Sequence, residues 1–183
     1  MNTHSLNEVY IHLFDRVYMS GVERDRSRVK STGEVFTPKE AVIQMLDKVP
    51  SELFSDPTKN AIDPACGDGN WLAEVLWRKV SNGIAFEVAL KTIYGVDLMN
   101  DNIVECKKRL LCGRTDLEEI VNLNIVCANS LTYHYRFDGT DPYLSDKDLA
   151  LNNQGFTGLD APKAPKIKKT KPVKEPISNP LFS

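Results

Sequence analysis

The sequence predicts an α/β fold built around a parallel sheet, because strand-like and helix-like segments alternate along the chain. Short apolar segments typical of buried strands lie at residues 60–63, 92–96 and 123–128. Segments with helical periodicity, 71–80 and 100–111, separate them. Strands that alternate with helices are usually joined by right-handed crossovers, so the three strands are expected to run parallel.

Composition narrows the class of protein. Of the 183 residues 42% are apolar, enough for a sizeable core, and the formal net charge of −2 provides no overall basic field. The four cysteines form no Cys-x-x-Cys pair and no histidine lies at zinc-like spacing, so we predict a reduced, cytoplasmic protein without a metal site. The first residues do not have the pattern of a signal peptide, and no stretch approaches 18 apolar residues, so no membrane contact is expected.

Two helices are expected before the first strand. Apolar and aromatic residues recur at helical spacing over residues 5–19, which predicts an N-terminal helical extension within residues 1–30. Thr37 is expected to cap the second helix and Pro38 to occupy its first position. This helix should end near Pro50.

The strongest local signal is the turn Asp63-Pro-Ala-Cys-Gly-Asp-Gly-Asn70, between the first strand and the helix that follows. Gly67 and Gly69 allow a tight turn and the close approach of a ligand. The start of the helix offers backbone N–H groups to a carboxylate. Asp63 stands at the carboxyl end of a strand, where open α/β sheets bind ligands, and can hold a ligand ammonium group. The alternative is an ordinary glycine-rich turn.

Asp97 ends the second strand about thirty residues later and is followed by Leu98. A carboxylate at this position can accept two hydrogen bonds from the hydroxyls of a ribose, although aspartate is also a common helix cap. A nicotinamide dinucleotide is a less suitable ligand, because Leu72 stands where the third glycine of Gly-x-Gly-x-x-Gly would be.

The turn at 63–70 resembles the first motif of amino-methylating DNA methyltransferases of the restriction-modification type, and residues 32–38 resemble the upstream motif of the same family. The resemblance implies a Rossmann-like class I methyltransferase sheet, apparently truncated, over residues 31–136, with S-adenosyl-L-methionine as cofactor. Phe36 would pack near the cofactor and Thr37 would contact its methionine end. The cofactor-binding residues implied in this way are Phe36, Thr37, Asp63, Ala65, Gly67, Gly69, Asp97, Leu98 and Asn129.

Asn129, after the third strand, stands where the family usually has an aspartate that accepts a hydrogen bond from the adenine amino group of the cofactor. An amide oxygen can also accept this bond, without the charge. A cap at the end of the strand is an equally good interpretation of Asn129.

The sequence Ile177-Ser-Asn-Pro-Leu-Phe-Ser183 resembles the catalytic signature of the family, Asp/Asn-Pro-Pro-Tyr/Phe, with Leu181 in place of the second proline. The resemblance implies that Asn179 and Pro180 accept hydrogen bonds from the target amine and that Phe182 stacks on the extruded base. A flexible tail with a chance match is the alternative.

Residues 137–176 are expected to form a polar and then Pro/Lys-rich linker between the core and this motif. Six lysines in it either contact DNA phosphates without reading sequence or simply keep the linker solvated. They are Lys163, Lys166, Lys168, Lys169, Lys171 and Lys174.

The resemblance is good over residues 31–131 and loose over 177–183. The expected function is methyl transfer from S-adenosyl-L-methionine to the N6 amine of adenine in DNA, by a partial or weakly active enzyme. Two alternatives stay open: a non-catalytic, cofactor-binding regulatory or vestigial subunit, and a methyltransferase for RNA or for protein glutamine. A second protein subunit is a possible partner.

Overall fold

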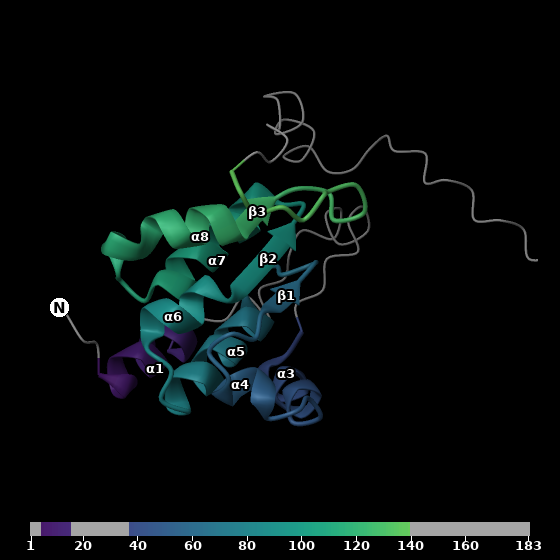
Figure 1. Ribbon diagram of the computed structural model, residues 1–183. Coiled ribbons are helices and arrows are strands. Elements are labelled where there is room, and N and C mark those ends of the chain that lie inside the picture. Colours follow the sequence, from purple (N-terminus) through teal and green to yellow (C-terminus); the bar gives the residue numbers. More distant parts are fainter. Residues whose placement is uncertain (1–4, 16–36, 140–183) are drawn as a thin grey trace, which may run out of the picture.

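The computed structural model describes residues 5–15 and 37–139, and shows an α/β fold around a three-stranded parallel sheet of order β1-β2-β3 (Figure 1). The strands are β1 (Ala61–Asp63), β2 (Ile93–Asp97) and β3 (Ile125–Cys127). All three arrows point the same way in Figure 1, and residues 129–139 lie at their carboxyl ends. The predicted α/β class and parallel sheet are confirmed, whereas a Rossmann-like identity stays a prediction.

The register of the strands brings the acidic strand ends together. Asp63 lies beside Gly95 of β2, and Asp97 lies beside Cys127 of β3. Because side chains alternate between the two faces of a strand, these four residues share a face with Ile93, which is buried in the main core. Both carboxylates therefore belong to the face of the sheet on which the main core packs.

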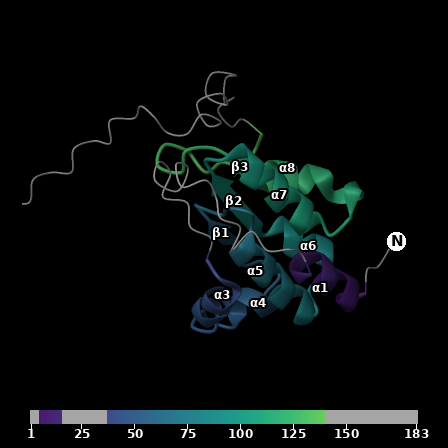
Figure 2. The same cartoon turned by 180° about the vertical axis from the view of Figure 1, so that it is seen from behind.

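The helices of the described ranges are α1 (Leu6–Phe14), α3 (Lys39–Leu46), α4 (Glu52–Ser55), α5 (Asn70–Ser81), α6 (Phe86–Lys91), α7 (Asn100–Leu111) and α8 (Glu118–Asn124), with a 3-10 helix, η1 (Thr115–Leu117). Figure 2 shows α1, α3 and α5 together on one side of the sheet. Within these ranges, no helix has the length and apolar character needed to cross a bilayer.

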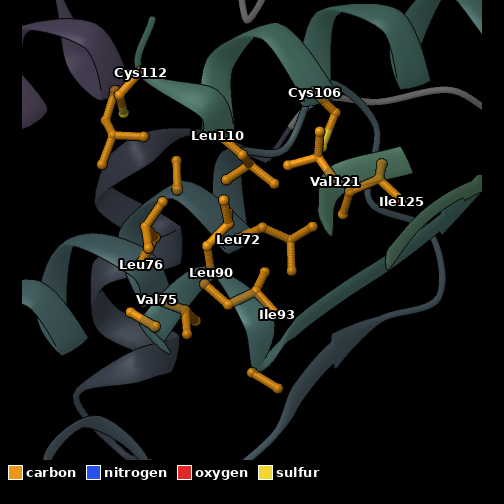
Figure 3. Close-up of a cluster of buried hydrophobic side chains, with 14 of the residues drawn as sticks. Leu72, Val75, Leu76, Leu90, Ile93, Cys106, Leu110, Cys112, Val121 and Ile125 are labelled. Atoms are coloured by element: carbon orange, nitrogen blue, oxygen red, sulfur yellow. The ribbon is translucent and has the colours of Figure 1, made fainter. Parts of the chain in front are cut away.

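The main core lies where α5 and α7 cover the sheet. Leu72 of α5 and Leu110 of α7 are fully buried and cluster with Ile93 and Ile125 of the sheet (Figure 3). Burying one such side chain contributes roughly 1.5–3 kcal/mol, so this cluster fixes α5 and the turn before it against the sheet.

Helix α1 begins with a capping box. Glu8 N donates to Ser5 Oγ over 3.3 Å, and Ser5 N donates to Glu8 Oε2 over 2.7 Å. Val9 and Leu13 are buried in the main core. The helix predicted at 5–19 is confirmed over Leu6–Phe14, but it ends at the C-cap Asp15, and residues 16–19 lie outside the described ranges.

The start of α3 differs from the prediction. The N-cap is Pro38 and the helix begins at Lys39, without a side-chain cap. Thr37 lies one residue further out, where its backbone carbonyl accepts a hydrogen bond from Asn70.

The predicted strand over 123–128 is too long, because α8 extends to Asn124 and β3 covers three residues only. The Asn124 side chain donates to the carbonyls of Leu90 and Lys91, at 3.4 and 3.3 Å, at the end of α6. These contacts with a distant helix end hold Asn124 in α8. The short elements α4, α6, η1 and α8 were not predicted, since each has too few residues to show a clear period.

Candidate functional site

A cavity of about 430 Å³ opens at the carboxyl end of β1, beside α3 and the turn between β1 and α5. Met45 and Trp71 give it apolar walls, and Asp63 gives it an acidic one. Its lining comprises Thr37, Val42, Met45, Ile62, Asp63, Pro64, Ala65, Cys66, Gly67, Asp68, Asn70 and Trp71. None of these lining residues is basic, so the described part of the cavity favours a cationic or neutral ligand.

The glycines of the turn are required by its geometry. Gly67 and Gly69 have left-handed φ values of 54° and 89°. A Cβ at Gly69 would also lie 2.7 Å from Cys106 Sγ of α7. Gly69 N donates to the carbonyl of Cys66 over 2.8 Å, which closes the turn. The predicted role of both glycines in shaping the turn therefore agrees with the geometry.

Gly95 is a third required glycine, which the sequence analysis did not select. A Cβ here would lie 2.8 Å from Leu72 Cδ1 and 3.0 Å from Cys66 Sγ, so only glycine lets the turn and α5 pack this closely on β2. A lone glycine inside a predicted strand was the available signal.

Asp63 carries an electrostatic cost in this position. Burial raises the pKa of its carboxyl, the hydrogen bond that Ala65 N donates to Oδ1 over 3.0 Å counteracts this in part, and the charge of Asp97 raises the pKa further. A buried carboxylate is stabilised by a nearby positive charge. A cation in the cavity would therefore favour the ionised form of Asp63.

Asp97 lies behind the turn. Its Oδ2 accepts from Gly67 N over 2.9 Å, and its Oδ1 accepts from Met99 N over 2.8 Å and from Asn102 Nδ2 over 3.2 Å. Neither Asp97 nor the adjacent Leu98 is among the residues that line the described part of the cavity, although Asp97 contacts one of them, Gly67. The contact with a ribose remains a prediction for both.

Asn129 forms a turn after β3. Its side-chain Oδ1 accepts from Leu131 N over 3.0 Å, and its carbonyl accepts from Thr132 N and Tyr133 N. This is the strand-end arrangement considered from the sequence. A contact between Asn129 and an adenine group stays a prediction.

Polar contacts join the start of α3 to the turn. Asn70 Nδ2 donates to the carbonyl of Thr37 over 3.0 Å, and Asn70 Oδ1 accepts from Arg109 Nη1 over 2.5 Å. Asn70 and Arg109 were missed as site residues, because their partners are 33 and 39 residues away in the chain.

The thiols near the turn are not poised as nucleophiles. A hydrogen bond with Cys106, together with burial, raises the pKa of the Cys66 thiol well above its ordinary value. Burial raises the pKa of Cys127 to about 11. The thiolate is the reactive and metal-binding form, and both groups stay protonated at neutral pH. Among the described residues, no group of three or more His, Cys, Asp or Glu could hold a metal ion.

Several predicted residues lie outside the described ranges, and the structure does not test them. These are Phe36, the catalytic candidates Asn179, Pro180 and Phe182, and the six lysines Lys163, Lys166, Lys168, Lys169, Lys171 and Lys174.

The strand-turn-helix unit and its cavity lie within a segment that matches a known family. The model of the N-6 DNA methylase family matches residues 10–149, well over half of the chain. The chain belongs to the N-6 DNA methylase family. The resemblance seen at residues 32–38 and 63–70 is thereby confirmed. No match to a curated protein or to a solved structure was found.

Proposed function

We propose that this N-6 DNA methylase chain binds S-adenosyl-L-methionine in the cavity and transfers its methyl group to the N6 amine of adenine in DNA. The observation that carries the proposal is the partly buried Asp63 carboxylate, whose pKa is raised, in a cavity lined by the glycine-rich turn and by no basic residue in the described ranges.

The residues present fit this cofactor. Asp63 is suited to its ammonium group, and the N–H groups in the first turn of α5 are suited to its carboxylate. Met45 and Trp71 offer apolar surface beside them. Family resemblance supports Phe36, Thr37, Ala65, Gly67, Gly69, Asp97, Leu98 and Asn129 as further contacts.

The cofactor supplies an activated methyl group when bound. By resemblance, the Asn179 side chain and the Pro180 carbonyl accept hydrogen bonds from the target amine, which raises the electron density on its nitrogen. Phe182 holds the extruded base by stacking. No strong base is needed for this arrangement.

Incubation of the full chain with labelled cofactor and unmethylated DNA tests the reaction. We expect N6-methyladenine in the digested DNA, and its loss in Asn179→Ala. Methylcytosine without methyladenine would overturn the choice of base. Label that appears only when extract from cells of the same origin is added would mean that a second subunit is required.

DNA is the proposed partner, and the six lysines at 163–174 are proposed to contact its phosphates. Each phosphate that is neutralised contributes about −0.9 to the slope of log affinity against log salt. Replacing all six lysines by glutamine should flatten this slope. An unchanged slope would mean that the lysine-rich segment acts only as a linker and does not contact DNA. A cytoplasmic location is also proposed, supported by the four free cysteines.

A further inference from the structure

Arg109 of α7 is a buried cation that contacts two other segments of the fold. It is 3% exposed. Its Nε donates to the carbonyl of Leu13 in α1 over 2.9 Å, and its Nη1 donates to Asn70 Oδ1 over 2.5 Å. The same Nη1 lies 3.6 Å from Asp68 Oδ2 in the glycine-rich turn.

The contacts of Arg109 extend to the wall of the cavity. Asp68 and Asn70 are buried and line the cavity. The Asn70 side chain also donates a hydrogen bond to the carbonyl of Thr37, another lining residue. Arg109 therefore fixes three lining residues from behind. A planar guanidinium with several fixed donors can do this, whereas a lysine ammonium is a single point charge.

The same guanidinium holds the last turn of α1. The carbonyls at the end of a helix carry partial negative charge and attract a cation. In the described ranges, no residue of α1 lines the cavity. Beside the apolar packing of α1 on α5, the two donors of Arg109 thus form a polar link between α1 and the turn.

We propose that Arg109 is a positioning residue that couples the docking of α1 to ligand binding in the cavity. A ligand that orders the glycine-rich turn stabilises Asp68 and Asn70 in the positions that hold Arg109, and Arg109 in turn holds α1. Coupling is reciprocal, so a docked α1 strengthens binding by the same factor. The identity of the ligand rests on the proposed function, but the link between α1 and the turn does not.

Hydrogen exchange of the full chain tests the link first without ligand. Arg109→Met is expected to speed exchange both in α1 and in residues 66–73. Arg114→Met is the matched control, because Arg114 also binds an aspartate, Asp116 at 2.6 Å, but this aspartate, unlike Asp68, does not line the cavity. It should leave both segments unchanged. If Arg109→Met fails to fold, Arg109→Met combined with Asp68→Asn removes both charges and takes its place.

The second measurement adds S-adenosylhomocysteine, the demethylated product. In the wild type it should slow exchange in α1, and this distant protection should be lost in Arg109→Met, with roughly tenfold weaker binding. Compared with Arg109→Met, Arg109→Lys should restore the melting temperature more fully than the affinity for S-adenosylhomocysteine. Equal affinity and equal protection of α1 in wild type and Arg109→Met would overturn the proposal. Failure of the wild type to bind, with the expected exchange pattern in the absence of ligand, would reject the proposed function and leave the link standing.

Discussion

Gly67 N donates a hydrogen bond to Asp97 Oδ2 over 2.9 Å, and so joins the glycine-rich turn to the end of the neighbouring strand, thirty residues away. The two strand-end acids consequently differ. Asp97 accepts from a backbone donor at Oδ2 and from a backbone and a side-chain donor at Oδ1, whereas Asp63 lines the cavity with a raised pKa. One acid organises the turn and the other is placed to meet a ligand.

Asp97→Asn should destabilise the fold. Three donors point at the two carboxylate oxygens of Asp97, and an amide offers one acceptor only, so at least one donor loses its partner. We expect the free energy of unfolding to fall by about 1–3 kcal/mol in urea denaturation. Asp101→Asn, at an exposed site in the first turn of α7, should have a smaller effect. An equal loss in the two variants would refute this role.

Gly69→Ala should cost more than Gly83→Ala. Both glycines have φ near +90°, but a Cβ at Gly83 meets nothing within 4 Å, while one at Gly69 meets Cys106 Sγ at 2.7 Å. The backbone penalty of about 1–2 kcal/mol is thus shared, and the steric term adds about 1–3 kcal/mol at Gly69 only. Cys106→Ala should recover part of this term in Gly69→Ala and none in Gly83→Ala. Thermal unfolding of all the single and double variants measures these losses of stability. Equal losses for Gly69→Ala and Gly83→Ala would show that the contact with Cys106 adds nothing to the cost.

Asp63→Asn should stabilise the ligand-free protein at neutral pH. The folded pKa lies above the ordinary value of 3.8, so the folded state binds more protons than the unfolded state between the two values. Stability that Asp63 contributes is therefore lost as the pH rises through the folded pKa. Asparagine removes this loss and keeps an acceptor for Ala65 N.

Urea denaturation between pH 4 and pH 7 checks this sign. Asp56→Asn is the control, because hydrogen bonds from Thr58 lower the pKa of Asp56 and its replacement should not stabilise. A wild type that is more stable than Asp63→Asn at pH 7 would show that Asp63 is a structural residue.

Lys79→Met should alter stability without altering binding. Lys79 is fully buried and donates to the Lys59 carbonyl over 2.6 Å and to Thr92 Oγ1 over 2.9 Å, just before β1 and β2 begin. Burial lowers its pKa below 10.5, so the unfolded state binds more protons in the interval between the two pKa values and stability rises with pH there. The variant should lack this rise in urea denaturation measured at increasing pH up to 10.5. Lys79 is not among the residues that line the cavity, so a change in ligand affinity would contradict this structural role.

The parts of the site that could be predicted are local in sequence. Asp63, Gly67 and Gly69 follow one another in a turn whose residue types restrict the backbone, and Asp97 ends the next strand. Residues that act across the fold could not be predicted in this way. Arg109 reaches Asn70 and Leu13 over 39 and 96 residues, and no short pattern encodes such a pair.

Secondary structure follows the same division. The two long helices α5 and α7 lie close to the ranges predicted from periodicity, because each has 12 residues, enough for apolar residues to recur on one face. The boundary between α8 and β3 depends on the contacts of Asn124 with α6, which belong to the tertiary structure. Met45 of α3 is 53% exposed and lines the cavity, a placement that the helical spacing of apolar residues alone does not reveal.

Calorimetric titration of the full chain with S-adenosyl-L-methionine at neutral pH tests the central claim most directly. We expect saturable binding by the wild type and by Asp56→Asn, which lies outside the cavity lining, and at least roughly tenfold weaker binding by Asp63→Asn, as a lost charge-assisted hydrogen bond of about 1.5–3 kcal/mol implies. No heat and no thermal stabilisation of the wild type at millimolar cofactor, or equal affinity in Asp63→Asn, would contradict the assignment of the cavity at the end of β1 as the cofactor site.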